Sequence, residues 1–134
     1  MLTINASTKP SPIHGIGLFT SNRISKGTVI WKFDPKFDRI FSPDEVEKMD
    51  GRKKEFIHHF AYLSKEVGQY VLPVDDTRFI NHSKQGNCTD VASGDSVAGA
   101  ITVANRDINA DEEITMDYRL FDAHDEISSE EYLK

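Results

Sequence analysis

Residues 78–83 have the sequence RFINHS, Asn87 follows shortly after, and residues 113–118 have the sequence EITMDY. In the first stretch an apolar pair runs directly into a polar Asn-His-Ser trio. Strand interiors favour β-branched and aromatic residues, whereas Asn and Ser favour turns in which their side chains bond the backbone. A polar trio in this position is unusual for a strand end, which makes this stretch the most informative part of the chain.

A third stretch agrees with these two, because residues 14–19 read HGIGLF and residues 24–30 read ISKGTVI. Together the three resemble the SET-domain lysine methyltransferases, whose hallmark motifs are RFxNHSCxPN and ELTxDY after an opening GxG strand. The resemblance covers nearly the whole chain, in the family's order. It implies a mainly β fold of the SET (β-clip) type, with small curved sheets and a C-terminal pseudoknot. The pseudoknot would bring residues 81–82 next to Tyr118.

The length of 134 residues fits one compact domain, so we expect a single SET domain over residues 1–134. The content of 38% hydrophobic and 28% charged residues is ordinary for a soluble protein. A net charge of -6 argues against direct nucleic-acid binding and suits a basic partner, although plain solubility explains it equally well. Cys88 is the single cysteine, which excludes an internal disulfide and a cysteine-rich zinc cluster, and we expect no metal site.

The chain shows no signal for secretion or for membrane insertion. Residues 1–7 have neither a basic nor an apolar region, and no apolar run approaches the ~20 residues that span a bilayer. We therefore expect no membrane partner and a cytoplasmic location. Targeting to a nucleus or to a host cell is not readable from the sequence.

The periodicity predicts many short strands interrupted by a helical insert at about residues 42–65. Ser42, Pro43 and Glu45 give an N-cap, a first-turn proline and an N3 glutamate, which predict a helix start. A second helix is predicted from about Arg52 to Lys65, with one apolar face consisting of Phe56, Ile57, Phe60, Ala61 and Leu63. A hairpin is predicted around residues 93–95, before a strand that alternates from Val97 to Ala104. Because helices do not alternate with strands, a parallel α/β sheet is excluded.

The resemblance implies S-adenosylmethionine (SAM) as the cofactor. In the family the GxG segment lies against the methionine part of SAM, and glycine permits the positive φ and the close backbone approach that this needs. A lone GxG is most often a simple turn, so the assignment depends on its place upstream of the other motifs. The resemblance also implies that the Asn81 side chain contacts the amino-acid end of SAM and that the His82 backbone contacts the adenine. The predicted cofactor-binding residues are Gly15, Ile16, Gly17, Asn81, His82 and Phe121.

Tyr118 is the predicted catalytic residue. Methyl transfer to an amine is an in-line displacement, which requires alignment of the reacting atoms and a neutral amine, although a free lysine has a pKa of about 10.4. Burial and a nearby sulfonium lower that pKa, and an uncharged tyrosine hydroxyl can orient the amine. Tyr70 and Met116 are predicted to line the lysine channel. Met116 stands where the family usually has Phe or Tyr, and its thioether cannot hold a water there, which favours di- or trimethylation.

Two positions depart from the family motif, since Lys84 replaces its Cys and Gly86 replaces its Pro. In zinc-bearing relatives that Cys ligates a metal with a cysteine-rich tail, and the acidic tail at about residues 119–134 has no Cys. Phe121, the segment 128–132 or a partner subunit must then close the channel, so a homodimer is one option. The acidic residues of the tail can attract a basic substrate, although such a run is usually a solvated face.

We therefore expect a minimal SET domain, similar to the stand-alone SET proteins of bacteria and viruses, that methylates a lysine ε-amine of a protein. The substrate can be histone-like or another basic protein. The alternative is a non-catalytic SET-like module that binds a peptide or a nucleotide, which the altered Lys84 and Gly86 keep open. A structural protein on the β-clip scaffold would need neither Asn81 nor Tyr118, and both are present.

Overall fold

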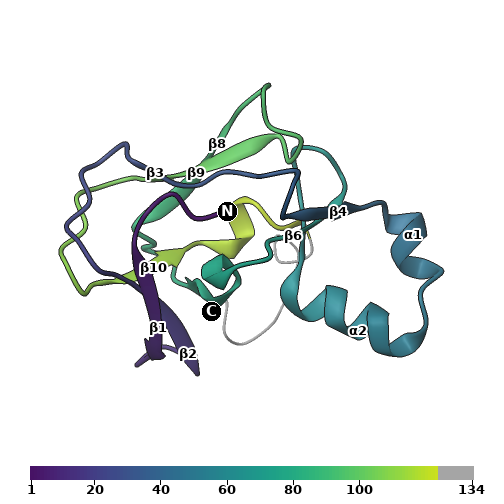
Figure 1. The fold of residues 1–134 in the computed structure, drawn as a ribbon, viewed down its shortest axis with the longest axis horizontal. Helices are drawn as coiled ribbons and strands as arrows, with labels where there is room; N and C mark the ends of the chain where they lie inside the picture. Colours follow the sequence, from purple (N-terminus) through teal and green to yellow (C-terminus); the bar gives the residue numbers. More distant parts are fainter. Residues whose placement is uncertain (124–134) are drawn as a thin grey trace.

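The computed structural model describes residues 1–123, which fold into two sheets and a pair of helices (Figure 1). The larger sheet has the order β1-β2-β10-β8-β9-β3, and β7 pairs with β10 outside this path. Its strands are β1 (Ala6–Pro10), β2 (Ile16–Thr20), β3 (Val29–Trp31), β7 (Asn81–His82), β8 (Cys88–Ala92), β9 (Ala100–Ala104) and β10 (Glu113–Met116). The smaller sheet has the order β4-β6-β5 and consists of β4 (Arg39–Phe41), β6 (Tyr70–Leu72) and β5 (Tyr62–Leu63). The mainly β fold class predicted from the sequence is confirmed.

Helices α1 (Pro43–Glu47) and α2 (Gly51–Phe60) lie together beside the smaller sheet, at one end of the molecule (Figure 1). The predicted helix start is confirmed, because the Ser42 hydroxyl accepts a hydrogen bond from the Glu45 N–H at 3.1 Å. The prediction for the second helix was wrong at its end. The helix ends at Phe60 instead of continuing to Lys65, since Tyr62 and Leu63 pair with β6.

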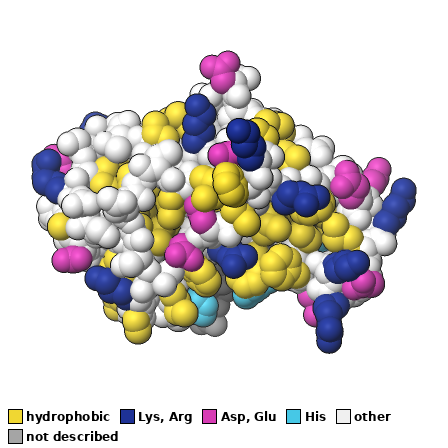
Figure 2. All heavy atoms as spheres, in the orientation of Figure 1, with side chains coloured by type: hydrophobic (Ala, Val, Ile, Leu, Met, Phe, Trp, Pro, Cys, Tyr) yellow, Lys and Arg dark blue, Asp and Glu magenta, His cyan; other side chains and the backbone are white. Residues whose placement is uncertain are grey.

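The face predicted for α2 is also partly wrong. Ile57 is buried in a cluster with Val46 and Tyr70, whereas Phe56 is 45% exposed. Figure 2 shows Lys and Arg side chains over the helical end of the molecule, with acidic side chains among them. Arg52 and Lys53, both exposed, belong to this end of the chain. The helical end is therefore an ordinary solvated surface with both signs of charge. No helix in residues 1–123 is long and apolar enough to cross a bilayer.

Strand β10 lies in the middle of the larger sheet although it comes late in the chain. It runs antiparallel to β2 and parallel to both β7 and β8. Thr115 pairs with Asn81, and Met116 pairs with His82 and with Cys88. The two motif stretches thus meet side by side, as the pseudoknot implied.

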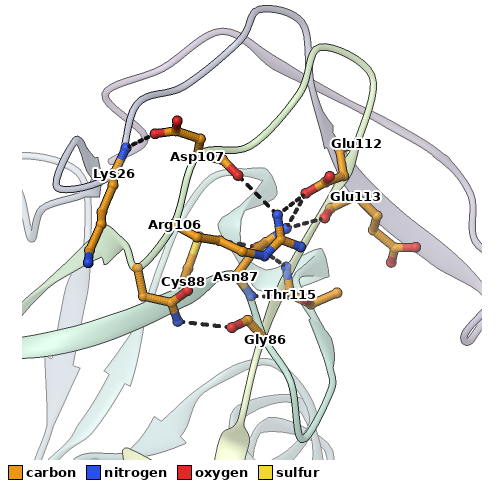
Figure 3. A network of polar contacts seen from close by, with 10 residues as sticks. Lys26, Gly86, Asn87, Cys88, Arg106, Asp107, Glu112, Glu113 and Thr115 are labelled. Atoms are coloured by element: carbon orange, nitrogen blue, oxygen red, sulfur yellow. Dashed lines mark hydrogen bonds and ion pairs between the residues drawn. The ribbon is translucent and has the colours of Figure 1, made fainter.

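A network of polar contacts fastens β10 to the segment that follows β7 (Figure 3). The side chain of Asn87, only 1% exposed, donates to the Glu113 carbonyl at 2.8 Å and to Glu112 Oε2 at 3.0 Å. Its Oδ1 accepts from the Thr115 N–H at 2.9 Å. Arg106 binds the same Glu112 carboxylate at 2.9 Å. A buried polar group without its partner costs free energy. This network therefore favours one placement of β10 against the segment that follows β7.

Gly86 explains one departure from the family motif. A Cβ at this position would lie 2.7 Å from the Met116 Cα and 2.9 Å from the Thr115 carbonyl oxygen. Both atoms belong to the β10 backbone and cannot move aside as a flexible side chain would. The Asn105 side chain also donates to the Gly86 carbonyl at 2.9 Å. The absence of a side chain at Gly86 therefore permits the close approach of this segment to β10.

The predicted hairpin is confirmed as the antiparallel pair β8–β9. Its second strand begins at Ala100, later than predicted, and Val97 in the connecting loop is 55% exposed. The buried side of β9 carries Ala100, Thr102 and Ala104. Of these three residues, Thr102 lines the cavity that is described below, whereas Ala104 packs in the core of the sheet.

Candidate active site

A cavity of about 1360 Å³ lies between the larger sheet, α2 and the two motif stretches. Its walls come from residues 13–16, residues 58–62, residues 77–82 and the segment around Tyr118, together with a few side chains from β3, β8 and β9. Ligand sites commonly measure ~300–1,000 Å³. The cavity is therefore large enough for a cofactor and for part of a second ligand.

Eight of the nine site residues predicted from the sequence line this cavity. They are Gly15, Ile16, Tyr70, Asn81, His82, Met116, Tyr118 and Phe121. Gly17 is the exception, because a Cβ there would lie 2.4 Å from Glu113 Oε2 and 3.1 Å from the Ser11 Cβ. Gly17 is thus needed for packing against Glu113, and not as a wall of the cavity. Gly15 has a φ of +45°, and nothing lies within 4 Å of the position of its absent Cβ.

Asn81 connects the turn at residues 14–16, called the opening turn below, to strand β10 at the centre of the larger sheet. Its side-chain nitrogen donates to the carbonyls of His14 at 3.0 Å and Ile16 at 3.3 Å, and to Glu113 Oε2 at 2.9 Å. The Glu113 carboxylate in turn accepts from the Ser11 hydroxyl at 2.8 Å. The Asn81 side-chain oxygen accepts no hydrogen bond from residues 1–123, so it is the atom that a ligand's ammonium group can use.

His82 positions the segment that carries Tyr118. Its Nδ1 accepts a hydrogen bond from the Tyr118 N–H at 3.1 Å, and the two rings lie edge to face with centroids 5.3 Å apart. An Nδ1 that accepts carries no proton, which fixes the neutral ring with its proton on Nε2. Hydrogen bonds from Arg119 hold the pKa of the neighbouring Asp117 below its usual range. This arrangement indicates that the His82 side chain positions Tyr118, whereas contact of its backbone with adenine stays a prediction.

The Tyr118 hydroxyl donates a hydrogen bond to the Ile80 carbonyl, within the RFINHS stretch. The hydroxyl is therefore held at the cavity wall by the backbone directly before Asn81. Its oxygen keeps acceptor capacity, because a hydroxyl that donates one hydrogen bond still has its lone pairs. Phe121 packs edge-on against Tyr118 at 5.8 Å and against Tyr62 at 5.1 Å. These three rings form one aromatic wall.

Tyr62 is a cavity residue that the sequence analysis missed, since the predicted second helix extended over it. Burial, followed by the charges of Asp90, Asp122 and Asp38, raises the pKa of Tyr62 well above its usual range. Its hydroxyl stays protonated at every ordinary pH. The alternation within β5 offers too short a signal to distinguish such a strand from a helix end.

The helical side of the cavity contains further residues that were not predicted. His58 and His59 line it from α2, although neither belongs to the apolar face predicted for that helix. Tyr70 lines the cavity as well, and the centroid of its ring lies 5.8 Å from that of the His58 ring. Burial is also the main cause that raises the pKa of Tyr70.

Met116 and Cys88 lie on neighbouring strands and are both part of the buried core of the larger sheet. Met116 also faces the cavity. Burial raises the pKa of the Cys88 thiol to about 12, so it behaves as a small apolar residue. Among residues 1–123, no group of three or more His, Cys, Asp or Glu side chains lies close enough to hold a metal ion. Of the segments proposed to close the channel, Phe121 is in place, whereas residues 124–134, most of the predicted acidic tail, lie outside the described part.

Comparison with known proteins supports the grouping of these motifs. The family model described as the SET domain matches residues 15–119. This range holds every predicted site residue except Phe121, which lies two residues beyond its end. The chain belongs to the SET-domain family.

Named relatives are lysine methyltransferases. The chain is 32% identical to the Drosophila melanogaster histone-lysine N-methyltransferase trr over 117 residues, which is 87% of this chain and 5% of that protein. It is 34% identical to the Xenopus tropicalis N-lysine methyltransferase KMT5A over 94 residues, which is 56% of this chain and 26% of that protein. The chain thus spans only a small part of these relatives.

Solved structures share the fold. A humanized mutant of the Chaetomium thermophilum Polycomb Repressive Complex 2, bound to an inhibitor, matches with a TM-score of 0.64 and 24% identity, over 88% of this chain and 15% of that chain. An apo form of the complex matches with a TM-score of 0.67 and 22% identity, over 90% of this chain and 16% of that one. At this level of identity the likeness concerns the fold alone.

Proposed function

We propose that this chain transfers a methyl group from SAM to the ε-amine of a lysine in a protein substrate. The observation that carries the proposal is the Tyr118 hydroxyl, which the Ile80 carbonyl holds at the wall of a large cavity. Asn81 follows Ile80 directly and secures the opening turn of residues 14–16 to the same cavity. The family and its named relatives support this reaction.

The residues present fit SAM at the end of the cavity formed by the opening turn. Gly15 leaves open space beside its backbone, and the Asn81 side-chain oxygen is an acceptor for the cofactor's ammonium group. Arg78 lines the cavity, and its buried Nε has no hydrogen-bond partner within residues 1–123. A carboxylate would satisfy this orphaned donor, so Arg78 is proposed to hold the carboxylate of SAM. Bound SAM supplies the electrophilic methyl group.

The remaining chemistry belongs to the lysine amine. The aromatic wall of Tyr62, Tyr118 and Phe121 excludes water and so disfavours the charged form of the amine. The Tyr118 hydroxyl oxygen, fixed by Ile80, accepts an N–H of the amine and aligns its lone pair for in-line attack. The flexible, apolar Met116 side chain at the cavity holds no water, which supports di- or trimethylation as the proposed product.

A basic protein is the proposed substrate class, because the chain has a net charge of -6 and its named relatives include histone-lysine methyltransferases. We also propose a cytoplasmic location and a homodimer that shares its channel. We propose that the chain has no nucleic-acid or membrane partner.

The test is transfer of labelled methyl from SAM to core histones and to a whole-cell lysate, with Tyr118→Phe beside the wild type. We expect label on lysine in the wild type, and a loss of about 100-fold or more in kcat in the mutant, because an orienting group is removed. Calorimetric SAM binding should be unchanged in Tyr118→Phe, which shows that the cofactor end is intact. If the wild type does not bind SAM and does not transfer label, the proposal fails. The chain is then better explained as the non-catalytic SET-like module.

A further inference from the structure

Three polar side chains that the proposed reaction does not use lie in one row across the larger sheet. In the pairing of β8 with β9, Asp90 is opposite Thr102, and in the pairing of β3 with β9, Trp31 is opposite Thr102. All three residues line the cavity. They come from the β8-β9-β3 side of the sheet, whereas the proposed cofactor residues come from the turn at residues 14–16, from Arg78 and β7, and from Phe121.

The Asp90 carboxylate in this row is held on one side only. The Thr102 hydroxyl donates to Asp90 Oδ1 at 2.7 Å, and no other hydrogen bond to the Asp90 carboxylate is formed within residues 1–123. No Lys, Arg or His of that same part forms an ion pair with it. Burial, together with the charge of Glu66, raises the pKa of Asp90 to about 6, against the lowering effect of the Thr102 hydrogen bond. The group is therefore largely ionised above that pH, in a poorly solvated place.

The surroundings of Asp90 favour a positive ligand. A second carboxylate, Asp122, lines the same cavity, and the only Lys or Arg among the described lining residues is Arg78. The Arg78 guanidinium stacks on the Phe60 ring at 4.7 Å, on the side of α2. Trp31 Nε1 is buried and makes no hydrogen bond within residues 1–123, so this end also has a donor for a water or a carbonyl.

We propose that Asp90, fixed by Thr102, binds the ε-ammonium of the substrate lysine as it enters the cavity and so selects a cationic side chain. This inference rests on the proposed function. An ion pair in a poorly solvated cavity is stronger than one in water, and a charged hydrogen bond contributes more than a neutral one. The ammonium gives its proton to solvent before transfer. Asp90 therefore acts in binding and selection, while alignment of the neutral amine belongs to Tyr118.

The first test needs no turnover. The Asp90 carboxyl carbon is followed by NMR through a pH titration, with and without n-butylammonium chloride as the probe, and with tetramethylphosphonium chloride as a control cation that cannot donate. We expect n-butylammonium to lower the pKa of Asp90 and to shift its resonance, and the control cation to do so less. If n-butylammonium changes neither the chemical shift nor the pKa of Asp90, the inference is overturned, even if methyl transfer is observed.

The second test uses the transfer assay on core histones with Asp90→Asn and a matched control, Asp95→Asn. Asp95 is exposed on the loop between β8 and β9 and carries the same charge change outside the cavity. We expect Asp90→Asn to raise KM for the histone by roughly tenfold or more, as loss of one charged hydrogen bond implies, with SAM affinity unchanged. Asp95→Asn should match the wild type. An unchanged KM in Asp90→Asn, or an equal rise in both variants, would refute selection by Asp90.

Discussion

Replacing Asp90 by Asn is expected to stabilise the folded chain at neutral pH, although it removes the proposed lysine contact. The folded-state pKa of about 6 lies above the ordinary value of 3.8, because burial disfavours the charged carboxylate. A difference of this size between the folded and unfolded states corresponds to ~3 kcal/mol once the group is ionised in both. The amide of Asn retains the oxygen that accepts from Thr102 and carries no charge to desolvate.

The sign of the pH dependence follows from that raised pKa. Below the unfolded pKa, Asp90 is protonated in both states and the buried group is neutral. As the pH rises through the folded pKa, the wild type loses this advantage, whereas Asp90→Asn does not titrate. The gain in unfolding free energy of Asp90→Asn over the wild type should therefore be small near pH ~4 and reach about 3 kcal/mol near pH ~8.

Urea unfolding of the wild type, Asp90→Asn and Asp95→Asn across this pH range measures the effect. Other carboxylates titrate in all three proteins, so the difference between variants isolates Asp90. The exposed Asp95 should give a difference that stays near zero. A difference for Asp90→Asn that does not change with pH would refute the reasoning. The expected outcome would mean that the Asp90 carboxylate, which is proposed to bind the substrate, lowers the free energy of unfolding of the chain.

Two further predictions concern the crossing of the motif stretches. Gly86→Ala should destabilise the fold by about 1–3 kcal/mol in urea unfolding, because its Cβ would overlap the backbone of Thr115 and Met116. Gly94→Ala, where nothing lies within 4 Å, should change stability by less than ~0.5 kcal/mol, and an equal loss in both would count against the overlap. The Cys88 thiol, with its pKa raised to about 12, should react with a thiol reagent only after denaturant is added, and prompt reaction in the native protein would contradict its burial.

Local signals in the sequence predicted the elements that depend on local chemistry. The cap at Ser42 and the hairpin near residues 93–95 both appear as expected. The second helix ends early because Tyr62 and Leu63 gain antiparallel pairing with β6, a contact that lies beyond the i+4 reach of helical periodicity.

The site shows the same division. Six of the eight predicted residues that line the cavity come from the motif stretches, whereas the Asp90–Thr102–Trp31 row depends on the registers of two strand pairs. The one signal in the sequence for this row was an acidic residue, Asp90, within strand β8. Gly17 shows the opposite case, because the motif identified the residue and only the structure shows that it packs against Glu113.

The central place of β10 has a consequence for how the chain acquires its structure. The strands on either side of it, β2 and β8, come earlier in the chain, yet within the sheet they are joined only through residues 113–116. Until those residues leave the ribosome, β2, β7 and β8 present unpaired edges, and such edges favour aggregation. The sheet and the cavity therefore form together in one late step, so we expect neither a partly folded chain with a working cofactor site nor fast folding.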